Sequence, residues 1–179
     1  MPKLYCVMLG GRAPRCNIEL HDIVFVVGDT LAATYPQLKH KWFGEATRLH
    51  IDAFVELSAV DGYQIELQQD PPKQQALALF CVNFGAYQPG VFGELHQVSF
   101  YVAPSKTEAL TRAKSELLST KVDPHCDDNI NIGSELSLDT SVDDLLGIKQ
   151  VDQYYLHLSR LAKATPPLNI ECGYRKILP

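Results

Sequence analysis

The sequence lacks any apolar run long enough to cross a bilayer. Its first apolar stretch, Leu4–Leu9, stops at Gly10 and Gly11, so it is also too short for the hydrophobic region of a signal peptide. The five cysteines include no Cys-x-x-Cys pair, and their number is odd. We therefore expect a cytoplasmic protein with reduced thiols and no membrane partner.

The chain also lacks an excess of positive charge. Sixteen basic side chains stand against 21 acidic ones, which gives a formal net charge of -5. This balance argues against a broad phosphate-binding surface, so nucleic acid is not an expected partner. The 179 residues, of which 46% are hydrophobic and 21% charged, are sufficient for one packed core or two small ones.

The most informative pattern is an internal repeat. Shifted by 75 residues, the chain matches itself without a gap, with ten identities in the 24 positions from Leu4 to Val27. Average composition predicts roughly one or two. We therefore predict a first repeat over residues 1–67, a second over 76–160, and a tail over 161–179 that adds an edge strand, all in one compact body.

Each repeat has the pattern of strand, loop, strand, helix, strand, strand. In the second strand, residues 19 to 27 alternate, and the face of Glu19 and His21 is the one kept in both copies, so we expect it to be the packed face. Ser105 and Glu108 form a capping box for the second helix. The predicted fold class is α+β, an internally duplicated unit with helices packed on an antiparallel or mixed sheet and pseudo-twofold symmetry.

The loop after the first predicted strand is one candidate for ligand binding. Its glycines allow close approach of backbone amides, and Arg12 and Arg15 supply positive charge for an anion. The matching loop of the second copy has no arginine. A simple turn is the interpretation we favour.

The polar residues that the repeat singles out are the main candidates for a site. Within each copy they form two pairs with i, i+2 spacing, which places both side chains of a pair on one side of a strand. These candidate ligand-binding residues are Glu19, His21, His50 and Asp52, and in the second copy Glu94, His96, His125 and Asp127.

Three interpretations of these residues stay open. Two imidazoles and two carboxylates at one place suit a divalent transition metal. The same groups are also suited to proton transfer, with a carboxylate orienting an imidazole. The third interpretation, which the sequence alone favours, is a structural network in which each polar group satisfies another.

Several of these motifs resemble a bacterial family known only as a domain of unknown function. The resemblance covers most of the chain and rests on Leu9-Gly-Gly-Arg12, Asn17-Ile-Glu-Leu-His-Asp22, Phe25-Val-Val-Gly28, His50-Ile-Asp52, Glu94-Leu-His96 and Tyr174-Arg-Lys-Ile177. It implies a small cytosolic bacterial protein and brings no catalytic residue, cofactor or substrate.

The sequence therefore leads to two functional hypotheses. The first is a non-enzymatic module, without a cofactor, that binds a small molecule or a protein. The second is a metal-dependent enzyme or metal-binding protein that uses the duplicated pairs to hold a divalent transition metal. Neither hypothesis assigns catalytic residues, and both are compatible with a homodimer.

Overall fold

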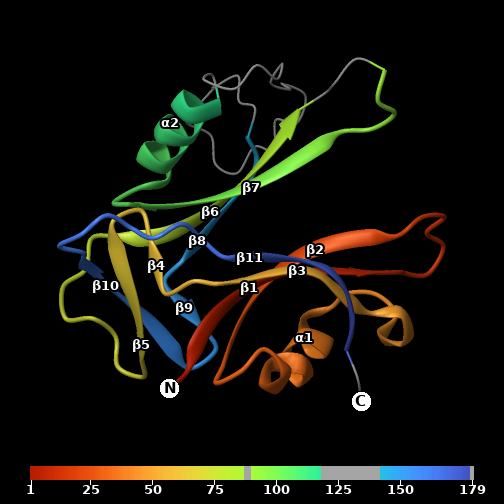
Figure 1. Cartoon of the computed structure of the whole chain (residues 1–179), viewed down its shortest axis with the longest axis horizontal. Coiled ribbons are helices and arrows are strands. Elements are labelled where there is room, and N and C mark those ends of the chain that lie inside the picture. Colours follow the sequence, from red (N-terminus) through yellow and green to blue (C-terminus); the bar gives the residue numbers. More distant parts are fainter. Residues whose placement is uncertain (87–89, 118–141, 178–179) are drawn as a thin grey trace. The chain divides into compact units, whose positions relative to one another are not determined.

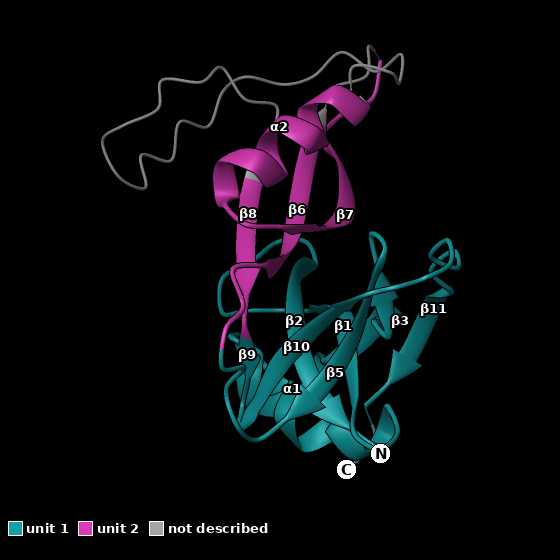
Figure 2. Ribbon diagram, turned by 90° about the vertical axis from the view of Figure 1, so that its left-hand side faces the viewer, with its two compact units in different colours: residues 1–73, 150–179 teal, residues 74–149 magenta. Residues whose placement is uncertain are grey.

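The chain forms two compact units (Figures 1 and 2). The computed structural model describes residues 1–86, 90–117 and 142–177. Unit 1 comprises residues 1–73 and 150–179, and unit 2 comprises residues 74–149. In the described ranges, every helix is too short or too polar to cross a membrane.

Unit 1 contains both ends of the chain. Its helix α1 spans Tyr35–Lys41, and short 3-10 turns lie at Ala32–Thr34 and Ala46–Arg48. Its strands are β1 (Lys3–Gly11), β2 (Leu20–Gly28), β3 (His50–Glu56), β4 (Ala59–Val60), β5 (Tyr63–Gln68), β9 (Gln150–Val151), β10 (Tyr154–Arg160) and β11 (Ile170–Lys176).

The first sheet of unit 1 has the order β11-β3-β1-β2, and all its neighbouring strands are antiparallel. Helix α1 begins with Pro36 in its first turn, where a missing N–H leaves no hydrogen bond unmade. Leu38 of α1 is fully buried and packs in one apolar cluster with Val24 and Val26 of β2. This cluster is the core beneath one face of the sheet.

The prediction for the faces of β2 was wrong in one respect. We expected the face that carries His21 and Phe25 to be the packed one, but the cluster with α1 uses the opposite face, that of Val24 and Val26. Phe25 is also buried. Because both faces of β2 are packed, the sequence pattern does not show which of them faces α1. His21 therefore lies on the sheet face away from α1.

The second sheet of unit 1 joins strands from both halves of the chain, in the order β4-β5-β10-β9. Asp61 and Gly62 connect β4 to β5 with positive φ angles of 55° and 82°, as the sequence predicts for a hairpin turn. Strand β5 pairs with β10 so that Glu66 lies opposite His157. Asp152, between β9 and β10, repeats the positive φ of Asp61.

Unit 2 is a three-stranded antiparallel sheet with one helix. Its elements are β6 (Ala78–Ala86), β7 (Leu95–Ala103), α2 (Lys106–Leu117) and β8 (Val142–Ile148), and the strand order is β7-β6-β8. The backbone N–H of Glu108 donates to Ser105 Oγ at 3.2 Å, which agrees with the predicted cap. Ala109 and Ala113 of α2 are fully buried against the sheet.

The two halves of the chain repeat one order of elements, β1-β2-α1-β3-β4-β5 and β6-β7-α2-β8-β9-β10. The compact units cut across these repeats, because β9 and β10 belong to unit 1. The fold is richer in sheet than we predicted. It consists mostly of antiparallel sheets, and its two described α-helices have 7 and 12 residues.

The offset between the repeats changes after the helix, which corrects the expected equivalence of the third strands. Ala53 pairs with Met8 and Asp144 pairs with Asn83, so β8 corresponds to β3 at a shift of 91 residues rather than 75. Register then equates Asp52 with Asp143. His125 and Asp127 lie outside the described residues.

Candidate metal centre

The central strand of the first sheet has a glycine at the point where the candidate residues meet. Gly10 of β1 is the cross-strand partner of His21 on β2 and of His50 on β3. A Cβ atom at this position would collide with His50 Nε2 and Asp52 Oδ2. The missing side chain therefore leaves space for groups from both neighbouring strands above β1.

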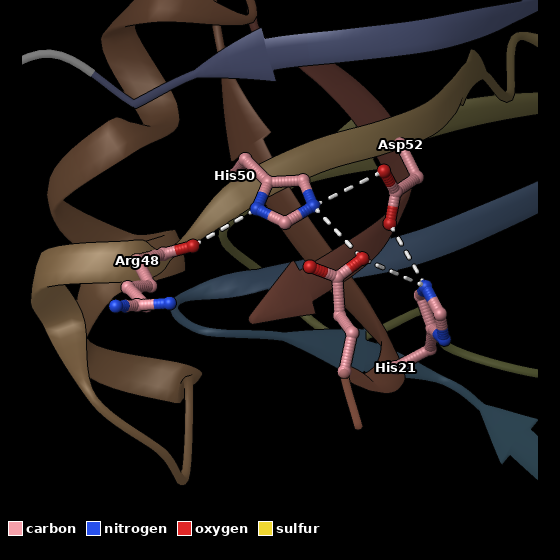
Figure 3. Close-up of polar contacts among 5 residues, drawn as sticks. His21, Arg48, His50 and Asp52 are labelled. Atoms are coloured by element: carbon pink, nitrogen blue, oxygen red, sulfur yellow. Dashed lines mark hydrogen bonds and ion pairs between the residues drawn. The ribbon is translucent and has the colours of Figure 1, made fainter. Parts of the chain in front are cut away.

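A bulge in β3 helps to bring the second carboxylate to the same place. Ile51 pairs with Leu9 and Ala53 with Met8, so Asp52 is the extra residue on β3. Bulges of this kind redirect a side chain and are common beside functional sites. Asp52 and His50 both reach into the space above Gly10. Figure 3 shows their side chains directed toward each other.

Four side chains converge there, and we call them the histidine–carboxylate cluster: Glu19, His21, His50 and Asp52. His50 Nε2 lies 3.3 Å from Glu19 Oε1 and 3.3 Å from Asp52 Oδ1. On the other side of the carboxylates, His21 Nε2 lies 3.2 Å from Asp52 Oδ2 and 3.6 Å from Glu19 Oε1 (Figure 3). The sequence prediction that these four residues act together is consistent with this geometry.

The hydrogen bond at Nδ1 of His50 determines whether Nε2 of the same ring is a donor or an acceptor. Nδ1 of His50 lies 2.9 Å from the carbonyl oxygen of Arg48, which can only accept, so Nδ1 carries a proton (Figure 3). In a neutral imidazole, Nε2 is then an unprotonated acceptor. It faces two carboxylate oxygens, which are also acceptors, and this arrangement requires a cation or an added proton between them.

Burial divides the cluster into an inner and an outer part. The side chain of His50 is 4% exposed, whereas those of Asp52, Glu19 and His21 are 27%, 44% and 51% exposed. The Oδ2 atom of Asp52 is buried and faces His21 Nε2 at 3.2 Å. The cluster thus combines a buried imidazole with a side that is open to solvent.

The distances between the ligand atoms are similar to those in a metal centre. Ligand atoms of Glu19, His50 and Asp52 all lie within 4.8 Å of one another. Donor atoms placed tetrahedrally at about 2.0 to 2.2 Å from one ion are about 3.3 to 3.6 Å apart. The separations from His50 Nε2 fall in this range, whereas direct hydrogen bonds are typically about 2.7 to 3.2 Å.

Comparison with known proteins gives the family of the chain. The model of Domain of Unknown Function (DUF1543) matches residues 16–67 and 92–139. The chain belongs to the DUF1543 family. This confirms the resemblance to a family of unknown function, and the match to two segments agrees with an internal repeat.

A solved structure also resembles this DUF1543 protein. It is the crystal structure of a protein Il1583 from Idiomarina loihiensis, which is 32% identical over 100% of both chains, with a TM-score of 0.74. No curated protein matches the chain. The first matched DUF1543 segment contains all four residues of the histidine–carboxylate cluster.

The second DUF1543 segment contains a weaker version of the cluster. His96 Nε2 lies 3.7 Å from Glu94 Oε2, and His96 Nδ1 contacts the side-chain amide of Asn83 at 3.3 Å. Gly85 is the cross-strand partner of His96, as Gly10 is of His21. Strand β8, which stands in the place of β3, contains no histidine. Among its described residues, unit 2 therefore shows the Glu94–His96 half of the arrangement.

The arginines proposed for anion binding lie in the loop between β1 and β2. Arg12 Nη1 donates to the carbonyl oxygen of Asn17 at 3.3 Å, which stabilises the loop itself. Arg15 is exposed and has a positive φ of 69°. These observations agree with the turn that we favoured from the sequence.

Sequence reasoning missed three residues beside the cluster. Gly10 was noted only as an identity between the copies. Tyr174 of β11 stacks on His50 with ring centroids 4.5 Å apart, and Lys176 of β11 is the cross-strand partner of His50. The motif Tyr174–Ile177 was visible in the sequence, but nothing local linked it to β3.

Proposed function

We propose that unit 1 is a metal-binding module that holds one divalent transition-metal ion in the histidine–carboxylate cluster. Glu19 Oε1, His50 Nε2 and Asp52 Oδ1 would supply three ligand atoms. His21 Nε2 would be either a fourth ligand or a support for the carboxylates, since it contacts both of them. Imidazole together with carboxylate is a donor set suited to zinc, and to iron or cobalt in related sites.

The observation that carries the proposal is the 2.9 Å contact between His50 Nδ1 and the Arg48 carbonyl oxygen. Because Nδ1 donates to the Arg48 carbonyl, the Nε2 lone pair of the neutral ring is directed at Glu19 and Asp52. A metal-bound histidine has this arrangement, with the second ring nitrogen donating to a carbonyl or carboxylate. A divalent cation would also cancel the charges of the Glu19 and Asp52 carboxylates. Without a cation these charges would repel each other, because their ligand oxygens lie within 4.8 Å.

The competing interpretation is the structural network that the sequence favoured. It requires His50 to be an imidazolium held by both carboxylates through hydrogen bonds. The four contacts in the cluster are 3.2 to 3.6 Å long, which is long for charge-assisted hydrogen bonds of about 2.7 to 2.9 Å.

Metal content is the direct test. Untagged protein, purified without chelator, is stripped of metal, titrated with Zn²⁺ or Co²⁺, and analysed by plasma mass spectrometry after gel filtration. We expect about one ion per chain in the native protein. Asp52→Asn and Glu19→Gln keep the size of each side chain while removing a charged ligand, so both variants should retain the fold and lose the ion.

Matched substitutions in the second copy are the control. Glu94→Gln and His96→Ala should leave the metal content unchanged. Native protein that stays metal-free at saturating Zn²⁺ and Co²⁺ would overturn the proposal. Full metal content in a folded variant that combines Glu19→Gln with Asp52→Asn would also overturn it.

A further inference from the structure

Strand β11 places two further side chains next to the cluster. Lys176 pairs with His50 across the β11–β3 boundary, and Tyr174 stacks on the His50 ring. The next residue, Ile177, packs against the apolar core on the α1 side of the sheet. Because neighbouring residues of a strand point to opposite faces, Lys176 points to the face that carries the cluster.

These residues form a single row across the sheet. From β11 to β2, the cross-strand partners are Lys176, His50, Gly10 and His21. Neighbouring strands lie about 4.8 Å apart, and directly opposite side chains have Cβ atoms about 4.5 to 5.5 Å apart. The flexible four-carbon stem of Lys176 can therefore bring its ammonium group over the neighbouring strand toward a group bound above Gly10.

Lys176 is free to take an external partner. Its side chain is exposed, and it forms no ion pair with any residue in the described part of the chain. Tyr174, 65% exposed, covers the His50 ring and leaves the outer side of the cluster, with Glu19 and His21, open to solvent. A ligand that approaches the cluster from solvent meets Lys176 at one end of the row.

Charge specifies the kind of ligand. A divalent ion would cancel the charges of Glu19 and Asp52, and two neutral histidines add none. Lys176 then leaves an excess of one positive charge beside the ion. With Glu19, His50 and Asp52 as its three protein ligands, the ion would keep a fourth position for an external ligand. An open metal position beside an ammonium group is complementary to an anion.

We infer that the metal site of unit 1 takes a small oxyanion, a carboxylate or phosphate group, which bridges the metal ion and the ammonium group of Lys176. This inference rests on the proposed metal site and names the class of ligand for it. The oxyanion would donate electron pairs to the metal through one oxygen and accept a hydrogen bond from Lys176 through another.

The test uses Co²⁺ as a spectroscopic probe in the full chain. Co²⁺-loaded protein, with its metal content measured first, is titrated with inorganic phosphate and, separately, with acetate, while the visible absorption of Co²⁺ is recorded. We expect a saturable change in the spectrum with one of the two anions, and the anion that binds more tightly identifies the phosphate or the carboxylate class. Lys176→Met should retain the Co²⁺ and bind that anion at least about tenfold more weakly, because it lacks a charge-assisted hydrogen bond.

Lys163→Met is the matched control, since Lys163 is exposed and lies between β10 and β11 rather than on the cluster row. It should bind the anion as the native protein does. Co²⁺-loaded protein whose spectrum responds to neither anion would overturn the inference, as would equal anion affinity in Lys176→Met and native protein. Both results leave the metal content intact, so they are distinct from a failure of the metal site itself.

Discussion

Gly10 and His50 are cross-strand partners, and the imidazole of His50 lies over the space that a side chain at Gly10 would fill. The central strand of the sheet thus contributes to the cluster by having no side chain. His21 approaches the same glycine from the other neighbouring strand. A three-strand arrangement of this kind explains how residues about 30 positions apart in the chain form one centre.

Gly10→Ala should damage the centre directly. The added methyl group would collide with Asp52 Oδ2 and His50 Nε2, and overpacking of this kind typically costs about 1 to 3 kcal/mol. We expect a lower melting temperature and a large loss of metal affinity, measured by thermal denaturation and Zn²⁺ titration. A variant that melts and binds Zn²⁺ like the native protein would show that the space above Gly10 is not used.

The two repeats should differ in metal binding. His96 has a glycine partner and a nearby Glu94, but β8 contributes no histidine in place of His50. Native mass spectrometry should therefore find one ion per chain rather than two. His96→Ala should leave that ion in place, whereas His50→Gln should remove it. Two ions of equal affinity would contradict this asymmetry.

Tyr174 should act as a positioning residue for His50. Its ring lies 4.5 Å from the imidazole at an interplanar angle of 36°, and aromatic contacts of this kind contribute about 0.5 to 1.5 kcal/mol. Tyr174→Ala should weaken Zn²⁺ binding by about two- to tenfold, with little change in the stoichiometry. Tyr174→Phe keeps the ring and should restore native affinity. Equal loss in both variants would point to the hydroxyl group instead of the stacking.

Unit 2 has its own pH-dependent feature. Burial, and then the hydrogen bond from the hydroxyl of Tyr101 to Glu116 at 2.8 Å, raise the pKa of Tyr101 far above its ordinary value of 10. The folded protein therefore holds this proton more tightly than the unfolded chain does. The resulting stability is fully present below pH 10 and is lost as the pH rises from there toward the folded pKa.

Urea denaturation at pH 8 to 11 tests this prediction. The native protein should lose stability above pH 10 more steeply than Tyr101→Phe, which has no proton to lose at this position. The phenylalanine variant should already be less stable at pH 8, because the hydrogen bond to Glu116 is gone. Parallel curves for the two proteins across the range would contradict the assignment.

The local elements of the fold were predictable because short-range physics determines them. The turn at Asp61 and Gly62, the Ser105 cap and the apolar strands of β1 and β6 all follow from neighbouring residues. The 75-residue repeat singled out Glu19, His21, His50 and Asp52, although the structure equates β3 with β8 at a shift of 91 residues. Periodicity does not specify which face a helix covers, so the sequence identified the packed face of Phe25 and Val27 but not the opposite face, which packs against α1.

Long-range pairing was not predictable from the pattern. Strand β8 takes the place of β3 at a shift of 91 residues, whereas the sequence repeat has an offset of 75. Strand β5 pairs with β10 from the other half of the chain, and the predicted edge strand of the tail, β11, pairs with β3 rather than with another edge. These pairings decide that Tyr174 and Lys176 stand beside His50, and no local signal encodes them.

Anomalous diffraction from crystals soaked in Zn²⁺ and recorded at the zinc absorption edge tests the central claim most directly. The metal site predicts one strong peak in unit 1, above Gly10, at about 2.0 to 2.2 Å from Glu19 Oε1, His50 Nε2 and Asp52 Oδ1. In Asp52→Asn crystals the peak should be absent. A soaked native crystal with no peak at the cluster, and with His50 hydrogen-bonded directly to Glu19 and Asp52, would show instead that the cluster is a structural network.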